Sequence, residues 1–444
     1  MTNRKQRLEF MSLTYAQLLG GNRNFRNLWL GQVVSELGNW FNFIAGLGLV
    51  RVVSGAAPEA AAIILVARTA PFALFMPLAG AIVDRASRRF VMLVTDFARA
   101  VVALGYLLVH DSSDLWIAYL CSVILALLTA FFEAAKNAAM PNVTGDEGLL
   151  AGNALMFSSR FLLMSVGAAL GGAASAYFGY QIAFIINAVS FLISAYSIWL
   201  VPNDVMHSRK PKSETDLESR VAAVFGDMKD GWSFIKSHPL VLTIIGDNIL
   251  WAVGGGAVNL IADRLGGVVF AEKDGWSADS AVAAIYTAAG LGLFVGMMLA
   301  RRVGDFVERK KFVVPFIGWT LIFQGVLFAV AGYLPNLWLV MAFMMFSRVL
   351  LGVEYAVQET MLMRAIPDDL RGRVMTTDRA AEISVFSLSN LAGGWSLYSI
   401  SPQMLTAVSG ILSAASGLFW FFRVARNKAS SENAETKPMV EAEA

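Results

Sequence analysis

Long apolar runs recur along the chain, separated by short polar or charged segments. A helix needs roughly 20 apolar residues to cross ~30 Å of hydrocarbon, so each run predicts one membrane-spanning helix. The predicted spans are 28–52, 61–83, 90–109, 115–139, 151–177, 180–201, 240–262, 281–300, 312–333, 337–363, 374–400 and 403–423. The pattern therefore predicts an all-α membrane protein with 12 transmembrane helices.

A polar stretch, residues 203–239, divides these spans into two sets of six. It contains six Lys or Arg and six Asp or Glu, which is typical of a linker with a short surface helix. We therefore expect an N-terminal segment 1–27, a six-helix bundle 28–202, this linker, a second bundle 240–423 and a tail 424–444. The tail has few large apolar side chains, so we expect it to be disordered.

The two sets of spans carry similar loop signals. After the fourth span, AAMPNVTGDEGLLAGNAL (138–155) passes through a proline and an acidic turn into a new helix, as RAIPDDLRGRVMTTDRA (364–380) does after the tenth. The basic loop GAIVDRASRRF (80–90) after the second span has a counterpart, GMMLARRVGDFVERKKF (296–312), after the eighth. These repeats predict two pseudo-symmetric six-helix bundles, the parallel-repeat arrangement of many secondary transporters.

Composition supports a membrane location. The chain is 57% hydrophobic and 15% charged, with a mean hydropathy of +0.59, which excludes an ordinary soluble protein of 444 residues. Of the 35 Lys and Arg residues, 26 fall on the side of the predicted spans that holds the N-terminus and 3 on the other. The positive-inside rule then predicts a multi-pass protein with cytoplasmic N- and C-termini.

Several classes of function are disfavoured. The net charge of +2 and the lack of basic clusters interleaved with aromatic residues give no reason to expect a nucleic-acid partner. The single cysteine, Cys121, excludes an intrachain disulfide and a Cys-based metal cluster. The histidines lie at predicted helix ends or in loops, and no Walker loop, metalloprotease or nucleophile-elbow motif is present. We therefore expect neither an enzyme nor an ATP-driven pump, and no cofactor or metal.

The loop GAIVDRASRRF resembles the signature G-x-x-x-D-R-x-x-R-R of the major facilitator superfamily. The matching positions are Gly80, Asp84, Arg85, Arg88 and Arg89. This resemblance implies the major facilitator fold and a cytoplasmic gate, in which the motif ties one half to the other when the protein is open to the outside. Alternatively, the arginines serve only to fix the topology.

Further segments point to a branch of that superfamily. NFRNLWLGQVVSELGNW (24–40), FFEAAKNAAMPN (131–142), LLAGNAL (149–155) and IPDDLRGRV (366–374) resemble macrolide and siderophore (enterobactin-type) exporters of the drug:proton antiporter group. The resemblance implies proton-coupled export of amphipathic compounds by alternating access. One departure is Ala168 in SVGAALGG (165–172), where such antiporters commonly carry a proline.

Charged residues inside the predicted spans need a partner or a purpose, because each costs ~2.5–3.5 kcal/mol on insertion scales. The candidates for a proton-coupling carboxylate are Glu36, Glu354, Asp247 and Glu382. Glu36 is the first choice because its helix lines the central cavity in this superfamily, with Arg160 as its expected partner. The alternative is a static Glu36–Arg160 pair that only orients helices.

Other charges are expected to act as partners. They are Arg99, Glu133, Lys136, Arg160, Arg348, Asp378 and Arg379. Glu133 and Lys136, three residues apart, favour a local ion pair or part of an inner gate. Asp378 and Arg379 belong to a charged cluster that is either a state-dependent salt-bridge network or a solvated loop.

Aromatic and amide side chains within the spans are candidates for the substrate cavity. These are Asn39, Trp40, Phe43, Trp251 and Phe386. We expect a monomer that handles a small amphipathic substrate and protons among membrane lipids. Import, transport of a lysophospholipid or another metabolite, and a sensor or scaffold role remain the alternatives.

Overall fold

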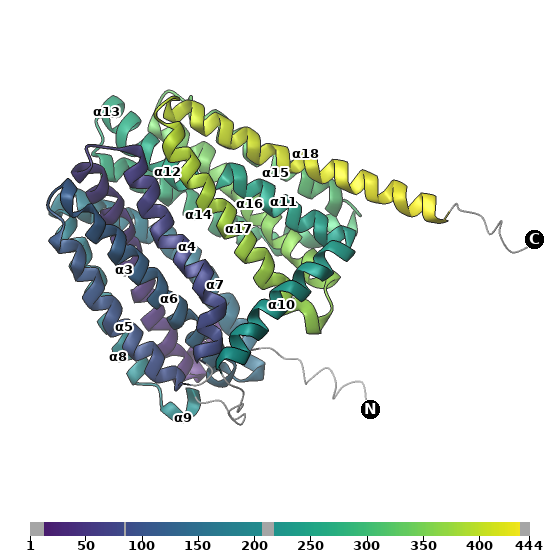
Figure 1. Ribbon diagram of the computed structural model, residues 1–444, viewed down its shortest axis with the longest axis horizontal. Helices are drawn as coiled ribbons and strands as arrows, with labels where there is room; N and C mark the ends of the chain where they lie inside the picture. Colours follow the sequence, from purple (N-terminus) through teal and green to yellow (C-terminus); the bar gives the residue numbers. More distant parts are fainter. Residues whose placement is uncertain (1–12, 84–85, 207–216, 436–444) are drawn as a thin grey trace, which may run out of the picture.

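The computed structural model describes residues 13–83, 86–206 and 217–435, which are almost entirely helical (Figure 1). The long helices of the first half are α3 (Arg23–Val53), α4 (Pro58–Val83), α5 (Arg88–Gly105), α6 (Leu115–Thr144), α7 (Asp146–Phe178) and α8 (Tyr180–Trp199). Those of the second half are α11 (Pro239–Gly255), α14 (Ala278–Arg309), α15 (Val313–Ala331), α16 (Leu337–Ala365), α17 (Asp368–Ser396) and α18 (Pro402–Glu435).

Helix α10 and several short helices mark the two ends of the molecule. The amphipathic helix α10 (Leu217–Ser237) and the short α9 (Asn203–Met206) lie at one end, which we call the linker end. The four-residue α13 (Ala271–Asp274) lies at the opposite end, called here the α13 end. The remaining short helix near the N-terminus is α2 (Tyr15–Gly21).

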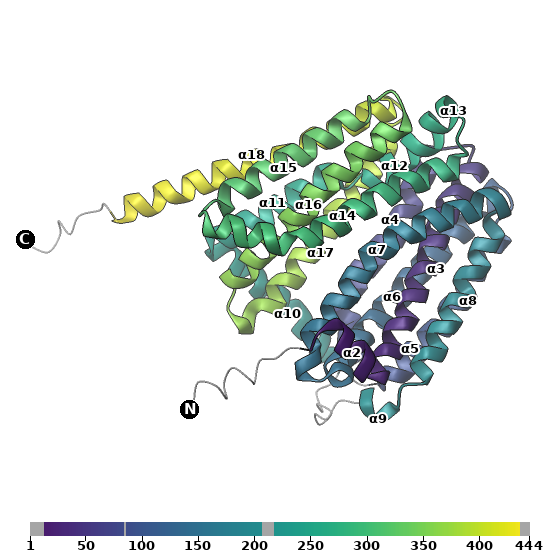
Figure 2. The same cartoon turned by 180° about the vertical axis from the view of Figure 1, so that it is seen from behind.

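Each half is a six-helix bundle, and the bundles stand side by side (Figures 1 and 2). Eleven of the predicted spans each fall on one long helix and the seventh falls on α11 and α12, which confirms the all-α fold of two six-helix bundles. Within the described ranges, eleven helical segments are long and apolar enough to cross a membrane. The remaining span is α17, which is less apolar but packs on α11 of its own half and α4 of the other.

Three local features differ from the expected pattern. Helix α6 continues through Pro141 to Thr144 and turns at Gly145, whose φ of 69° suits glycine. The seventh span is broken, because α11 ends at Gly255 and the chain continues as α12 (Val258–Arg264) and a π-helical segment (Leu265–Phe270). Helix α18 extends to Glu435, well into the segment expected to be disordered.

The two halves meet mainly through α7 with α14 and α4 with α17, as the views from opposite sides show (Figures 1 and 2). Gly172 of α7 lies so close to Ala283 of α14 that a side chain at 172 would overlap it. On the other face, the hydroxyls of Thr69 and Ser387 lie 3.5 Å apart. Gly172 lies near the end of α7 at the α13 end, whereas Thr69 and Ser387 lie toward the middle of α4 and α17. The bundles diverge toward the linker end.

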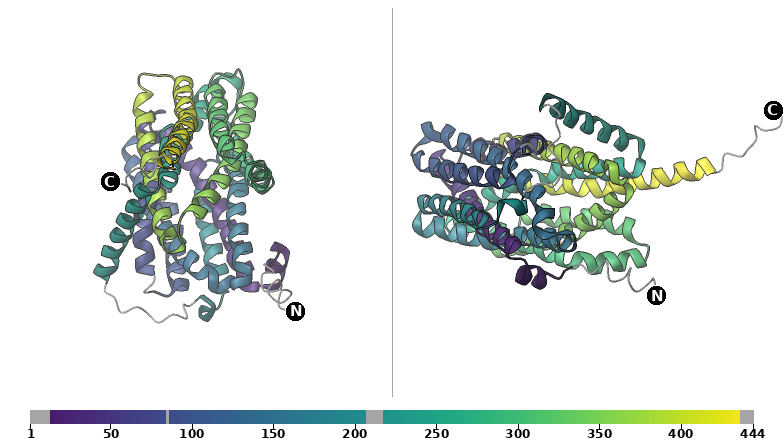
Figure 3. Two further views of the ribbon diagram at one scale, coloured as in Figure 1. Left: turned by 90° about the vertical axis from the view of Figure 1, so that its right-hand side faces the viewer. Right: turned by 90° about the horizontal axis from the view of Figure 1, so that it is seen from below.

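Helix α10 bridges the halves at the linker end by packing on α17 and α4. Its acidic residues hold α17 through Arg373, whose guanidinium lies 2.8 Å from Asp227 and 3.0 Å from Asp230. Further views show α10 running beside the second bundle (Figure 3). The linker is therefore a structural strap between the bundles as well as a connection.

Candidate functional site

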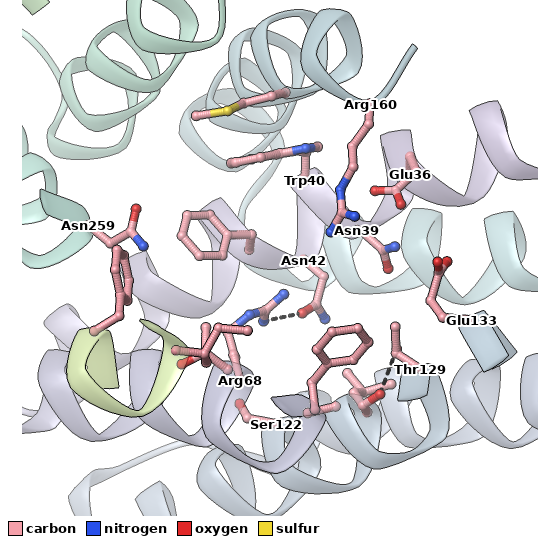
Figure 4. Close-up of a pocket in the computed structure, with 18 of the residues that line it drawn as sticks. Glu36, Asn39, Trp40, Asn42, Arg68, Ser122, Thr129, Glu133, Arg160 and Asn259 are labelled. Atoms are coloured by element: carbon pink, nitrogen blue, oxygen red, sulfur yellow. Dashed lines mark hydrogen bonds between the residues drawn. The ribbon is translucent and has the colours of Figure 1, made fainter. Parts of the chain in front are cut away.

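A cavity of about 540 Å³ lies between the two halves (Figure 4). Its walls come from α3, α4, α6, α7 and α8 of the first half and from α11, α12 and α17 of the second. This size is within the usual range for small-molecule sites. Since both halves contribute walls, a bound molecule would contact both bundles.

All five residues expected at a substrate cavity lie in its wall: Asn39, Trp40, Phe43, Trp251 and Phe386. The rings of Trp40 and Phe43 pack edge to face with centroids 5.1 Å apart. Tyr286 of α14 closes the cluster at 5.8 Å from Trp40 and 5.2 Å from Phe43. An aromatic wall therefore joins α3 of the first half to α14 of the second.

Glu36 and Arg160 lie beside each other at the same cavity, with Arg160 reaching across from α7 to α3 (Figure 4). Glu133 of α6 also faces the cavity and forms an ion pair of 2.5 Å with Lys136 one turn along. Lys136 is itself 3.4 Å from the side-chain oxygen of Gln32. The first half thus contributes two acids to the cavity, each with a cation close by.

The second half contributes one acid to the cavity, Glu382 of α17. Arg379 donates to it at 2.7 Å and stacks over Tyr355 with its guanidinium 5.3 Å from the ring centre. Asp378 points instead into the bundle, where it is almost fully buried and accepts from the Asn248 amide at 3.1 Å. Asp378 and Arg379 therefore belong to helix contacts within the second half, and neither lies in a solvated loop.

Asp247 and Glu354 are in the core of the second half, away from the cavity wall. Gln358 donates to Asp247 at 2.8 Å, and one oxygen of each carboxyl group has no hydrogen-bond partner. Among the described residues, no Lys or Arg nitrogen lies within 4.0 Å of either group. Two buried carboxyl groups without a cation cannot both be ionised at low cost.

Two further predicted charge partners are buried. Arg99 of α5 pairs with Asp96 one turn earlier, and its guanidinium lies between the rings of Phe132 and Phe191, 4.1 and 4.5 Å from their centres. Arg348 of α16 lies 5.2 Å from the centre of the Phe328 ring. It lines a smaller cavity of about 130 Å³ that adjoins the main one.

The signature loop lies at the linker end, between α4 and α5. Arg89 donates to the carbonyl of Trp199 at 2.5 Å, and the Ser87 hydroxyl contacts the side chain of Asn203 at 3.0 Å, so both tie the loop to the end of α8 and to α9. A Cβ on Gly80 would meet no atom within 4 Å, so no helix approaches closely there in this conformation. Arg88 begins α5.

The other two signature residues, Asp84 and Arg85, lie outside the described residues. The gate proposed for this motif therefore stays a prediction.

A buried ion cluster that the sequence did not indicate joins the halves at the α13 end. Arg51 of α3 forms ion pairs with Asp263 of α12, at 2.5 Å, and with Asp279 of α14. Arg51 and both aspartates are less than a tenth exposed. Next to this cluster, Arg264 donates to the carbonyl groups of Ala56 and Ala57, at 2.6 and 3.1 Å. Charged contacts thus close this end of the molecule.

Sequence reasoning missed this cluster because its members are more than 200 positions apart. Arg51 and Arg264 are two of the three basic residues on the side of the predicted spans opposite the N-terminus, and nothing near them in the sequence indicates a buried partner. One signal in the sequence could have indicated the cluster: basic residues are rare on the side of the predicted spans opposite the N-terminus, so each one there is a candidate for a specific contact. The sequence analysis also missed three residues that line the main cavity: Arg68, Asn42 and Asn259. Their place in its wall depends on how helices distant in the sequence pack together.

The profile of the Major Facilitator Superfamily matches residues 28–277 and 258–443. The chain belongs to the major facilitator superfamily. The two matched stretches overlap and together cover both bundles, and the family indicated by the signature loop is thereby confirmed. The protein is a non-enzymatic, multi-pass membrane transporter of this superfamily.

Relatives of this major facilitator superfamily (MFS) transporter include two proteins of Bacillus subtilis. The uncharacterized MFS-type transporter YfiS is 26% identical over 230 residues, which are 51% of this chain and 52% of that protein. BacE, a candidate bacilysin exporter, is 28% identical over 195 residues, 43% of this chain and 46% of BacE. The matched region thus spans about half the length of these relatives.

Among solved structures, the fold resembles a bacterial homologue of the iron transporter ferroportin in its inward-facing state. The TM-score is 0.67 at 16% sequence identity, and the match covers 90% of this chain and 98% of the other. At this identity the likeness concerns the fold alone. Within the described ranges, no group of three or more His, Cys, Asp or Glu side chains is arranged to hold a metal ion.

Proposed function

We propose that this MFS transporter exports amphipathic organic compounds across the bacterial inner membrane in exchange for protons, by alternating access. The cavity between the halves is the observation that carries the proposal. Its aromatic rings suit an apolar body, and its charged and amide side chains suit polar groups of a ligand. The likeness to BacE supports the direction of transport.

The distribution of charge in the sequence supports an orientation for this conformation. If the positive-inside rule holds, the linker end is cytoplasmic and the Arg51 cluster lies at the periplasmic side. The halves are in contact at the α13 end and diverge at the linker end, as expected for an inward-facing transporter. Each chain has a cavity of its own, which fits a functional monomer.

We assign proton coupling first to Glu36. It lines the cavity, and its neighbour Arg160 comes from a different helix, so a relative movement of α3 and α7 would change the charge that Glu36 experiences. A carboxylate inside a membrane protein binds a proton more readily once a neighbouring cation moves away from it. Glu36 can therefore exchange protons in step with the conformational change.

Asp247, Glu354 and Glu382 are the further candidates. Asp247 and Glu354 have no cation close by, which favours a proton on at least one of them, but they do not face the cavity in this conformation. Glu382 faces the cavity and is paired with Arg379. These acids would take the coupling role if Glu36 does not.

The signature loop is proposed as the gate of the opposite conformation. A Cβ at Gly80 would have no atom within 4 Å, so a helix of the second half could approach this position once the linker end closes. Asp84, Arg85, Arg88 and Arg89 would then supply the charged contacts across the interface.

The test is transport by the purified protein in proteoliposomes with an imposed pH gradient. Candidate substrates are macrolides, siderophores, dyes and lysophospholipids, compared between wild type and Glu36→Gln. Glu308→Gln is a matched control, since Glu308 is exposed and pairs with Arg364 away from the cavity. We expect Glu36→Gln to abolish pH-driven accumulation while substrate exchange without a gradient continues, and Glu308→Gln to behave like wild type.

Other results would overturn parts of the proposal. Unchanged pH-driven transport in Glu36→Gln would move the coupling role to Asp247, Glu354 or Glu382. Flux driven by a sodium gradient alone would exclude proton coupling. Accumulation opposite to the expected direction would indicate an importer, and binding without any flux would indicate a sensor or scaffold.

A further inference from the structure

The charges around the main cavity are unequally paired. Each carboxylate in its wall has a cation close by: Glu133 pairs with Lys136, Glu382 pairs with Arg379, and Glu36 lies beside Arg160. The wall also contains Arg68 of α4. Over the described part of the chain, no Asp or Glu oxygen lies within 4.0 Å of this guanidinium. Arg68 is thus the cavity arginine without an acidic partner.

The groups that contact Arg68 are neutral. It donates to the side-chain oxygen of Asn42 at 2.7 Å, and its guanidinium lies 5.2 Å from the centre of the Phe43 ring. The hydroxyl of Tyr106 is a further neighbour, and it in turn lies 2.6 Å from the Ser122 hydroxyl. Figure 4 shows Arg68 and Asn42 joined at the cavity wall. Dipoles and an aromatic face orient the guanidinium without neutralising it.

The side-chain amide of Asn42, beside Arg68, is a hydrogen-bond donor without an acceptor in the described part of the chain. Asn42 is fully buried and also forms part of the cavity wall, and its amide nitrogen has no hydrogen-bond partner among the described residues. A buried donor left without an acceptor is costly, as is a cation at membrane depth. Arg68 therefore provides a positive charge and Asn42 an unused N–H donor. An anionic group of a ligand could accept hydrogen bonds from both.

An apolar surface adjoins these donors. The ring of Phe43 beneath Arg68 belongs to the cluster with Trp40 and Tyr286. A molecule with an anionic group at Arg68 would place an attached aromatic or aliphatic body against this cluster. Trp251 and Phe386 of the second half also line the main cavity, so such a ligand would contact both bundles.

We propose that the cavity selects amphipathic anions, with Arg68 and Asn42 binding a carboxylate or phosphate group and the rings of Trp40 and Phe43, which pack against Tyr286, binding the apolar body. This inference deepens the proposed transport function and rests on it for the identity of the ligand as a substrate. A carboxylate and the phosphate of a lipid headgroup share the chemistry that Arg68 recognises, and the experiment separates them.

The test measures binding of four probes that share one aromatic body. They are 1-naphthylacetate, 1-naphthyl phosphate, 1-naphthylacetamide and 1-naphthylmethylammonium, titrated calorimetrically against the full chain in nanodiscs of zwitterionic lipid. We expect the acetate, the phosphate or both to bind wild type about tenfold or more tightly than the amide, because a charged hydrogen bond is stronger than a neutral one. A preference for the phosphate alone would indicate a lipid-type headgroup.

Four variants test whether the preference arises at this site. Arg68→Gln should remove it, by about tenfold weaker binding of the anion with little change for the amide, while Arg68→Lys retains part of it. Asn42→Ala should weaken anion binding severalfold. Arg348→Gln removes the same charge outside the main cavity and should leave the preference intact.

Two results would overturn the anion site. One is equal or tighter binding of the amide or the ammonium probe to wild type. The other is an Arg68→Gln variant that keeps the wild-type preference, or that weakens all four probes equally with an unchanged unfolding temperature. Failure of transport is a separate outcome: Arg68-dependent binding without flux in proteoliposomes supports the anion site and contradicts the transport proposal.

Discussion

At the scale of single residues, four arginines within the helices differ in whether an acidic side chain lies beside them. Arg51 and Arg99 are buried against aspartates. Arg68 and Arg348 have neutral neighbours, within the part of the chain that the structure describes. Arg51 and Arg99 are thus held by acidic partners. Arg348 lies outside the main cavity, whereas Arg68 faces that cavity and remains free to bind a ligand.

The Asp96–Arg99 pair gives a stability prediction. Arg99 is enclosed by Asp96 and the two rings of Phe132 and Phe191, so Arg99→Gln would leave a buried carboxylate without its cation. We expect a loss of about 3–5 kcal/mol in unfolding free energy, the usual cost of removing one partner of a buried pair. Thermal unfolding in detergent, followed by tryptophan fluorescence, measures the change.

The double variant Asp96→Leu with Arg99→Met serves as the control. It removes both charges and fills the space with apolar side chains, so it should unfold close to the wild-type temperature. A single variant as stable as wild type would contradict a structural role for this pair.

At the scale of helices, glycine positions set how closely the bundles pack. Gly172 on α7 leaves room for Ala283 on α14, and Gly290 on α14 likewise faces the backbone of α7 at Ser165. The nearby hydroxyl of Ser165 donates across the interface to the carbonyl of Thr287 at 2.9 Å. Small residues thus permit direct backbone contact between the two halves.

Gly172→Leu should therefore force the halves apart at the α13 end. A membrane-impermeant maleimide added from that side would then react severalfold faster with a cysteine placed at Asn39 in the cavity, in a Cys121→Ser background. Leu170→Phe, on the exposed face of the same helix, provides the comparison and should leave the rate unchanged. Equal labelling of all three proteins would show that this contact does not close the α13 end.

The helices could be predicted from the sequence because membrane hydrocarbon imposes a length and an apolar composition on each span. The halves were predictable too, since the polar linker and the repeated loops mark them locally. The cavity residues Trp40 and Phe386 were likewise expected, because they are large or polar groups within spans that face the centre. The Arg51 cluster and the Arg68–Asn42 contact were not, because they depend on the relative rotation and tilt of helices distant in the chain.

At the scale of the whole molecule, the bundles are in contact at the α13 end and diverge at the linker end, which is one of the two conformations that the proposed alternating access requires. The Arg51 cluster joins α3 to α12 and α14, so it exists only while the α13 end is closed. Charged contacts that form in one state and break in the other are a common means of biasing such an equilibrium. Their free energy sets the ratio of the two conformers.

Arg51→Ala should shift the population toward the conformer closed at the linker end. Spin labels at Ser113 and Glu272 report on the α13 end, and labels at Ala86 and Lys310 report on the linker end, all exposed positions in a Cys121→Ser background. Electron–electron distance measurements should give a longer distance for the first pair and a shorter one for the second. Arg264→Gln, which loses only hydrogen bonds to carbonyl groups, is expected to have a smaller effect. Unaltered distances in Arg51→Ala would mean that the cluster does not control the equilibrium.

The modest apolarity of α17 has a consequence for how the protein is made. A nascent helix with arginines and acids along its first half gains little by leaving the translocation channel for lipid on its own. Helices α4 and α11, which it packs against, are already synthesised when α17 emerges, and α18 follows within a few residues. Integration of α17 into the bilayer is therefore expected to depend on partners made earlier, one from each half of the molecule.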